Sequence, residues 1–218
     1  MLLKNLQPFF NKAVCAAVLL MLNFTTNAQV KIACIGDSIT EGSGLSSTSE
    51  SYPSQLQGLL RTSYSVGNFG KAGSALLKTS KGDYWTETVY KNALAWNPDV
   101  VIIKLGTNDS KAGNWVYKSR FYNDYVDFIN SFKSLPSKPK IYICYPLPAY
   151  DNRYDIQEEV IKKEIIPIIK QVAKETNTTF IDLYTPFYGK KELLPDGVHP
   201  NAAGAKYLAQ EVYKAIDK

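Results

Sequence analysis

The sequence predicts an α/β protein in which helices cover a parallel sheet of five strands. Short runs rich in β-branched residues alternate with longer amphipathic stretches, which is the order of elements in a parallel sheet with helical crossovers. These signals continue without a linker to within a few residues of the C-terminus. We therefore expect one domain over residues 29–218, a length that suffices for a full hydrophobic core.

Five apolar runs have the length and composition of buried strands. We place the strands at Val30–Ile35, Ser65–Phe69, Val100–Leu105, Lys140–Cys144 and Thr179–Leu183. Five amphipathic stretches are predicted helices, at Tyr52–Arg61, Thr86–Trp96, Ser119–Lys133, Asp155–Glu175 and Ala202–Ile216. In the last stretch, apolar residues recur at steps of three and four. Because Pro167 lies inside the fourth stretch, we expect a kink or a fresh helix start there.

The first 28 residues have the layout of a secretory signal peptide. Lys4 and Lys12 precede an apolar run over residues 13–22, and the small-residue ending Thr26–Ala28 follows. The apolar run is shorter than the roughly 20 residues that a membrane-spanning helix needs. We therefore expect cleavage and export to the periplasm or the extracellular space, without stable membrane insertion; an uncleaved anchor is the alternative.

Charge and cysteine usage exclude several classes of partner. Removing residues 1–28 takes away two lysines and no acids, which lowers the formal net charge from +5 to +3, and so mild an excess does not indicate a nucleic-acid partner. After this removal one histidine and two distant cysteines, Cys34 and Cys144, remain and provide no zinc-ligand spacing, so we expect neither a metal nor another cofactor. Both cysteines lie in apolar strand-like runs, which favours buried free thiols over a disulfide.

Four polar motifs lie at loop positions of the predicted sheet. Three of them follow the first three strands and read GDSIT at residues 36–40, NFGKAG at 68–73 and GTND at 106–109; the fourth, DGVHP at 196–200, precedes the last helix. In an open parallel sheet the ligand crevice lies beyond the carboxyl ends of the strands. These motifs are therefore expected to meet at one crevice.

The residue types in these motifs suit acyl transfer through a serine. Such a reaction needs a nucleophile, a base, an acid that orients the base, and donors for the oxyanion. Ser38 is the candidate nucleophile, and His199, the only histidine of the chain, is the candidate base. Asp196 precedes it by three residues, close enough in a turn to orient the imidazole. The candidate oxyanion donors are the amides of Ser38 and Gly70 and the side-chain amide of Asn108.

Each motif alone also has a structural interpretation. Asp37, Ser38 and Thr40 could cap a helix or turn, the glycines could serve turns, and a histidine before a proline could be a surface residue. A phosphate site is disfavoured, because the glycine spacing at residues 70–74 matches neither phosphate-binding fingerprint. The four motifs together favour catalysis.

In these residues the chain resembles the SGNH, or GDSL, hydrolase family. The match comprises Ser38, Gly70, Asn108 and His199 in the order of the family's blocks, from about Lys31 to the C-terminus, with Ile39 where the family name has leucine. The resemblance implies a three-layer, flavodoxin-like α/β/α fold and ester hydrolysis without a cofactor. The G-x-S-x-G elbow of α/β-hydrolases is missing.

Composition near the crevice favours a short acyl group, and the family resemblance implies a carbohydrate substrate. The segment after Gly106 is polar, whereas a lipase would be expected to carry an apolar lid. Small exported members of the family that resemble this chain often deacetylate carbohydrates, including sialic acids and xylan. The resemblance therefore implies a carbohydrate O-acetylesterase of the sialate or xylan type, with a glycan ester or another small ester as substrate. A lysophospholipase or thioesterase and a non-catalytic glycan-binding relative are the alternatives.

Several residues are candidates for substrate contact. Aromatic and polar side chains near the strand ends could face a sugar, and we select Asp37, Trp85, Trp115 and Tyr145, with Tyr84 and Tyr150 as further aromatic candidates. The competing interpretation is packing, because Tyr and Trp supply large buried area in any core.

Overall fold

The computed structural model describes residues 28–216. Apart from Ala28, the predicted signal peptide lies outside these residues. The described chain forms a five-stranded, all-parallel sheet with the order β2-β1-β3-β4-β5, which is the flavodoxin-like order. The strands are β1 (Val30–Gly36), β2 (Tyr64–Gly70), β3 (Val100–Lys104), β4 (Lys140–Cys144) and β5 (Thr179–Ile181). The predicted fold class is thus confirmed.

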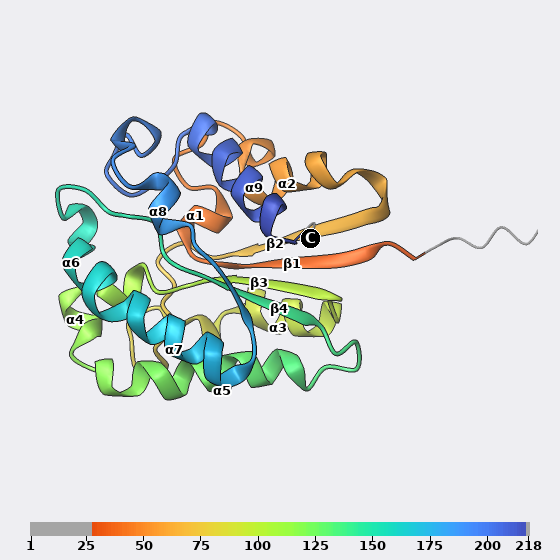
Figure 1. Ribbon diagram of the computed structural model, residues 1–218, viewed down its shortest axis with the longest axis horizontal. Coiled ribbons are helices and arrows are strands. Elements are labelled where there is room, and N and C mark those ends of the chain that lie inside the picture. Colours follow the sequence, from red (N-terminus) through yellow and green to blue (C-terminus); the bar gives the residue numbers. More distant parts are fainter. Residues whose placement is uncertain (1–27, 217–218) are drawn as a thin grey trace, which may run out of the picture.

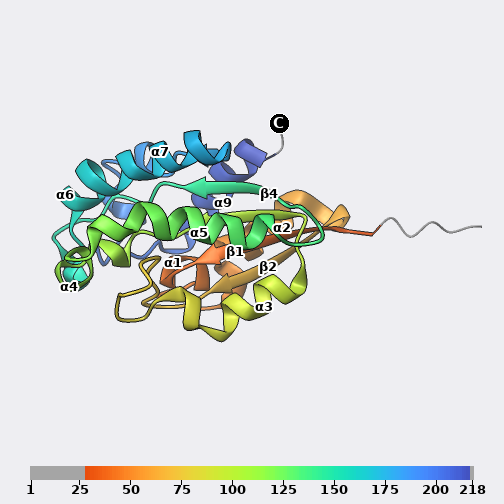
Figure 2. The same cartoon turned by 90° about the horizontal axis from the view of Figure 1, so that it is seen from below.

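Two layers of helices cover the sheet (Figure 1). Helices α2 (Tyr52–Leu60) and α9 (Ala202–Ile216) pack on one face, and α3 (Thr88–Trp96), α5 (Phe121–Lys133) and α7 (Ile166–Thr176) pack on the other. Figure 2 shows α5 between α7 and α3. Short helices occupy the connections: α1 (Ser38–Glu41), α4 (Ala112–Trp115), α6 (Glu158–Val160) and α8 (Tyr184–Phe187).

The register of the sheet brings the ends of the first three strands together. Gly36, the last residue of β1, is paired with Gly70 of β2 on one side and with Lys104 of β3 on the other. The chain runs from β1 to β2 on one side and then crosses to β3 on the other. The motifs that follow these strands therefore emerge at the switch point of the sheet, where open α/β sheets bind ligands.

The fourth predicted helix is interrupted near Pro167, as expected. After α6, the backbone forms a π-helical turn over Ile161–Ile165 before α7 begins at Ile166. Pro167 has no amide hydrogen to donate to the preceding turn, and a π-helical turn accommodates such a break. The helical segment starts at Glu158 rather than Asp155, because Asp155 has a φ of 61°, which lies outside the helical range.

The core lies on both faces of the sheet and contains both cysteines. Cys34 in β1 and Cys144 in β4 are free and fully buried, as predicted, and β3 lies between their strands. Burial raises the pKa of the Cys34 thiol to about 12, so this thiol stays protonated at neutral pH. No helix within residues 28–216 is long and apolar enough to cross a membrane.

Candidate active site

The first strand passes directly into helix α1, which places Ser38 at the edge of the sheet. Asp37 caps this helix, because its Oδ1 accepts a hydrogen bond of 3.0 Å from the Ile39 amide. A Cβ on Gly36 would lie 2.0 Å from Thr40 Oγ1. Only glycine at position 36 therefore permits this tight turn. Helix α1 begins directly after it, with Ser38 as its first residue.

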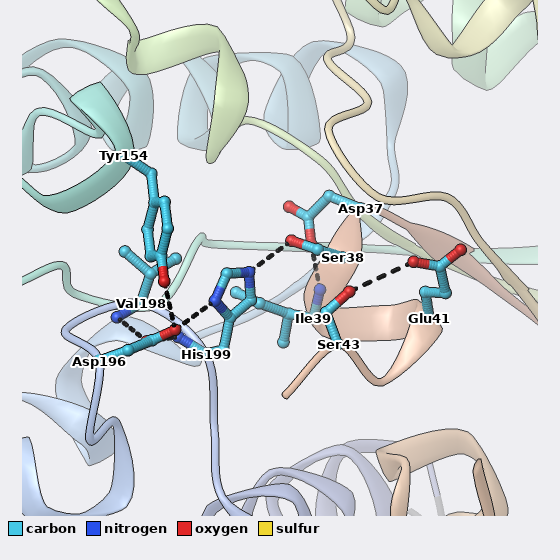
Figure 3. A network of polar contacts seen from close by, with 9 residues as sticks. All are labelled: Asp37, Ser38, Ile39, Glu41, Ser43, Tyr154, Asp196, Val198 and His199. Carbon is cyan, nitrogen blue, oxygen red and sulfur yellow. Dashed lines mark hydrogen bonds and ion pairs between the residues drawn. The ribbon is translucent and has the colours of Figure 1, made fainter. Parts of the chain in front are cut away.

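Ser38, Asp196 and His199 form one hydrogen-bonded chain (Figure 3). The Nε2 atom of His199 lies 2.9 Å from Ser38 Oγ, and its Nδ1 atom lies 2.7 Å from Asp196 Oδ2. An ionised carboxylate can only accept, so Nδ1 carries the proton and donates it to Asp196. The lone pair of Nε2 then faces Ser38, which is the arrangement that general-base catalysis requires.

The loop before α9 holds Asp196 in place. Its Oδ1 atom accepts hydrogen bonds from the amides of Val198, at 2.9 Å, and His199, at 2.7 Å. Partial burial acts to raise the pKa of Asp196, but the hydrogen bonds from the His199 amide and ring and from the Val198 amide outweigh it. The pKa therefore lies below its ordinary value, and Asp196 is ionised at neutral pH.

Three N–H groups near Ser38 are free to face an oxyanion. The amides of Ser38 and Gly73 donate to no acceptor within residues 28–216. The side-chain amide of Asn108 donates one hydrogen to the Ser74 carbonyl, at 3.0 Å, and an amide group has a second one. Gly73 and Asn108 both line the cavity at Ser38.

The expectation for Gly70 needs correction. Its amide donates to Asn68 Oδ1 at 2.9 Å, and Gly70 does not line the cavity. A Cβ on Gly70 would lie 2.1 Å from the Glu41 amide nitrogen. The missing side chain therefore allows α1 to approach β2, and it is Gly73, three residues later with a φ of 79°, that reaches the cavity.

A buried carboxylate fixes the loop that carries Gly73. Asp109 accepts hydrogen bonds from the amides of Leu76, at 2.9 Å, and Leu77, at 2.8 Å. Burial raises the pKa of Asp109 to about 6, although these amide hydrogen bonds oppose the shift. Asn108 and Asp109 are neighbours and bind the same loop, so the end of β3 positions both the Asn108 and the Gly73 donors.

A buried ion pair lies beside Ser38. Lys104 Nζ, at the end of β3, lies 3.3 and 3.4 Å from the two oxygens of Asp37 and 3.5 Å from Thr107 Oγ1. Lys104 is 1% exposed and Asp37 0%. Because the carboxylate is sealed from the cavity, Asp37 neutralises Lys104 and caps α1 rather than contacting substrate.

The cavity at Ser38 is small and open on one side. Its volume is about 240 Å³, below the roughly 300–1,000 Å³ of pockets that enclose drug-sized ligands. Its walls come from the strand-end loops, from the turn after α1 and from the loops before α6 and α9: Ser38, Ser43, Ala72, Gly73, Thr107, Asn108, Lys111, Tyr154, Ile156, Val198 and His199. It can enclose a small group, with the rest of a ligand outside.

The three aromatic residues selected as substrate contacts pack elsewhere. Trp85 stacks edge-on against Phe128, with ring centroids 5.0 Å apart. Trp115 is buried and donates to Glu164, and Tyr145 is buried in the core. None of them lines the cavity, because the large apolar area of each ring is used in packing.

Sequence reasoning missed Tyr154, Lys111 and Ile156. Lys111 lies within the polar segment that follows Asn108, so its place beside the cavity could have been inferred. Tyr154 and Ile156 belong to a loop beyond β4 without a recognisable motif. Among residues 28–216, no three His, Cys, Asp or Glu side chains are grouped so that they could hold a metal ion.

Comparison with known proteins identifies the class. The sequence profile of the GDSL-like lipase/acylhydrolase family matches residues 34–207, and the chain belongs to this family. An acetylxylan esterase of Xylanibacter ruminicola is 39% identical over 206 residues, which cover 86% of this chain but 43% of that protein. The chain thus spans less than half the length of that relative.

Two further relatives match over nearly their whole length. An acetylxylan esterase of Geobacillus stearothermophilus is 28% identical over 215 residues, covering 85% of this chain and 93% of its own. The crystal structure of a lipase/acylhydrolase from Enterococcus faecalis superposes with a TM-score of 0.70 at 25% identity, covering 85% of this chain and 94% of that one. The family fold therefore extends over most of the chain.

Proposed function

We propose that this protein is an exported serine ester hydrolase that removes O-acetyl groups from a carbohydrate, with acetylated xylan as the foremost candidate substrate. The observation that carries the proposal is the hydrogen-bonded chain from Asp196 through His199 to Ser38, which opens into a small cavity. The acetylxylan esterase relatives support the choice of substrate.

In the first half of the reaction, Ser38 Oγ attacks the carbonyl carbon of the acetyl ester. The hydroxyl proton passes to Nε2 of His199, and Asp196 stabilises the imidazolium that forms. The amides of Ser38 and Gly73 and the side chain of Asn108 donate to the oxyanion. His199 then gives its proton to the sugar oxygen as the carbon–oxygen bond breaks, which leaves acetyl-Ser38 and a free hydroxyl on the sugar.

The second half regenerates the enzyme. Water attacks the carbonyl carbon of acetyl-Ser38 while His199 accepts one of its protons, and the same three donors hold the second oxyanion. Collapse of this intermediate returns the proton from His199 to Ser38 and releases acetic acid, which ionises to acetate and a proton in solution. The reaction thus consumes one water molecule, and its proton transfers need only protein groups.

The size of the cavity supports a short acyl group. A space of about 240 Å³ accommodates an acetyl group, whereas a long acyl chain would extend beyond it. Polar and small residues, among them Thr107, Gly73 and Ala72, form part of its wall. The sugar would then lie across the open side of the cavity.

The test is hydrolysis of p-nitrophenyl acetate, butyrate and octanoate by the mature protein, together with acetate release from acetylated xylan, with Ser38→Ala as control. We expect kcat/KM to fall from acetate to octanoate and acetate to be released from the xylan. Preference for octanoate would instead favour a lysophospholipase or thioesterase, and binding of acetylated xylan without hydrolysis of any ester would favour a glycan-binding protein.

A further inference from the structure

Tyr154 contacts Asp196 and His199, the other two members of the hydrogen-bonded chain that ends at Ser38. Its hydroxyl donates to Asp196 Oδ2 at 3.2 Å, and its ring lies edge-on to His199, with centroids 5.4 Å apart and planes inclined by 66° (Figure 3). The residue also lines the cavity at Ser38. One side chain thus joins the orienting carboxylate, the base and the open side of the cavity.

The backbone around Tyr154 has an unusual conformation. Asp151, Asn152, Tyr154 and Asp155 all have a φ between 47° and 62°, a region that residues with a side chain seldom adopt. Such conformations persist only where the surrounding structure fixes them, and they cluster at functional sites. The fold therefore holds Tyr154 at the cavity despite the unfavourable backbone.

Contacts on both sides of the loop fix this conformation. Before it, the Tyr150 amide donates to the Gly197 carbonyl at 2.8 Å, which ties the loop to the residue next to Asp196. After it, Ile156 is buried and forms part of the cavity wall. On the surface, Lys191 forms an ion pair of 2.5 Å with Asp151. Tyr154 is thus held in register with the turn that carries Asp196 and His199.

The hydroxyl of Tyr154 completes the set of donors to Asp196. Oδ1 accepts from two backbone amides, and Oδ2 accepts from both the His199 ring and the Tyr154 hydroxyl. The hydrogen bond from the Tyr154 hydroxyl to Oδ2 fixes the oxygen that orients the imidazole. Loss of this hydrogen bond should therefore lower kcat for every ester, whatever the alcohol.

The ring of Tyr154 is available to the alcohol part of the substrate. Tyr154 is 53% exposed, and among the described residues that line the cavity it is the one Phe, Tyr or Trp. With the acetyl group enclosed at Ser38, the sugar lies at the open side, where an aromatic face can cover the apolar C–H face of a sugar ring. The Arg153 guanidinium lies over this ring, 5.9 Å from its centroid, although Arg153 does not line the cavity.

We propose that Tyr154 is both a positioning residue for Asp196 and His199, through its hydroxyl, and the platform for the sugar ring of the substrate, through its aromatic face. The second role rests on the proposed carbohydrate esterase function. The two roles are separable, because Tyr154→Phe removes the hydroxyl alone and Tyr154→Asn removes the ring as well. Asparagine is suitable because it tolerates a positive φ.

The experiment compares acetate release from ethyl acetate, which has neither a sugar nor an aromatic ring, and from acetylated xylooligosaccharides. For Tyr154→Phe, kcat should fall about 3- to 10-fold on both esters with KM unchanged, as loss of one hydrogen bond implies. For Tyr154→Asn, KM for the oligosaccharides should in addition rise about 3- to 10-fold, while KM for ethyl acetate stays within about twofold.

Tyr188→Asn is the matched control, because Tyr188 is 58% exposed and does not line the cavity; it should leave all four constants unchanged. Full kcat in Tyr154→Phe would overturn the positioning role. Equal changes of KM on both esters in Tyr154→Asn would overturn the platform. If the unmodified protein hydrolyses ethyl acetate but no acetylated oligosaccharide, the carbohydrate function and the platform both fail, while kcat on ethyl acetate still decides the positioning role.

Discussion

Ser38→Ala and His199→Ala should each lower kcat for p-nitrophenyl acetate by about 10⁴- to 10⁶-fold, and the double variant should be no slower than either single variant. The reason is that Ser38 Oγ and His199 Nε2, 2.9 Å apart, act as one unit. Once either residue is missing, the proton transfer from Ser38 Oγ to His199 Nε2 no longer occurs, and removing the other residue costs nothing more. Steady-state kinetics on the four proteins measures the effect.

Ser46→Ala is the control for these variants, because Ser46 is exposed and, within residues 28–216, its hydroxyl binds only Glu50; its kcat should equal that of the unmodified protein. The melting temperatures of all variants should remain close to one another. Losses that multiply in the double variant would show that Ser38 and His199 act independently, contrary to the proposed mechanism.

Lys104→Met should lower the free energy of unfolding by about 3–5 kcal/mol, the usual cost of leaving one charge of a buried pair uncompensated. The substitution leaves the Asp37 carboxylate fully buried, and the Ile39 amide is then its only hydrogen-bond donor in the described part of the chain. Methionine has nearly the length of lysine, so little packing is lost. Urea denaturation followed by circular dichroism measures the change.

The double variant Asp37→Asn with Lys104→Met separates charge from packing. It removes both charges, and asparagine can still cap α1 at the Ile39 amide. We expect it to recover most of the stability that Lys104→Met loses, because a buried ion pair can often be replaced by neutral residues at little cost. A single variant as stable as the unmodified protein would contradict the role of this ion pair.

The fold could be predicted from the sequence because local patterns determine it. A period of two or a continuous apolar run marks each strand, and a period of 3.6 marks each helix. The observed strand ends differ from the predicted ones by at most two residues. Helix starts are harder to predict from the sequence. The predicted start at Ser119 lies two residues before the observed start of α5 at Phe121, because Lys118–Arg120 forms a 3-10 turn that no sequence period distinguishes from a helix.

The sequence predicted which kinds of residue surround Ser38. It did not predict which glycine amide is free to donate a hydrogen bond at the cavity. Gly70 and Gly73 both follow the second strand, and both fit a close approach of backbone to a ligand. Which amide remains free depends on Asn68, whose side chain accepts from Gly70, and on the packing of α1 against β2. The Asn68 contact is a local turn that the sequence allows at this position, whereas the packing of α1 against β2 is a tertiary contact that leaves no mark in the local sequence.

The surroundings of the substrate were the least predictable part. Trp85 and Trp115 follow strands, as crevice residues do, but the energetic gain from burying large rings places Trp115 in the core and packs the partly buried Trp85 against it. Tyr154 reaches the cavity through a run of non-glycine residues with positive φ. Asp151, Asn152 and Asp155 are residue types that tolerate this conformation, but nothing in the sequence indicated that Tyr154 would also adopt it and line the cavity.

The measurement that tests the central claim most directly is covalent labelling with a fluorophosphonate, which reacts with activated serine nucleophiles. The account predicts one phosphonyl group per chain, located by peptide mass spectrometry on Ser38, with loss of esterase activity in proportion to labelling and no labelling of His199→Ala. Labelling of another residue, or full activity after Ser38 has reacted, would contradict it.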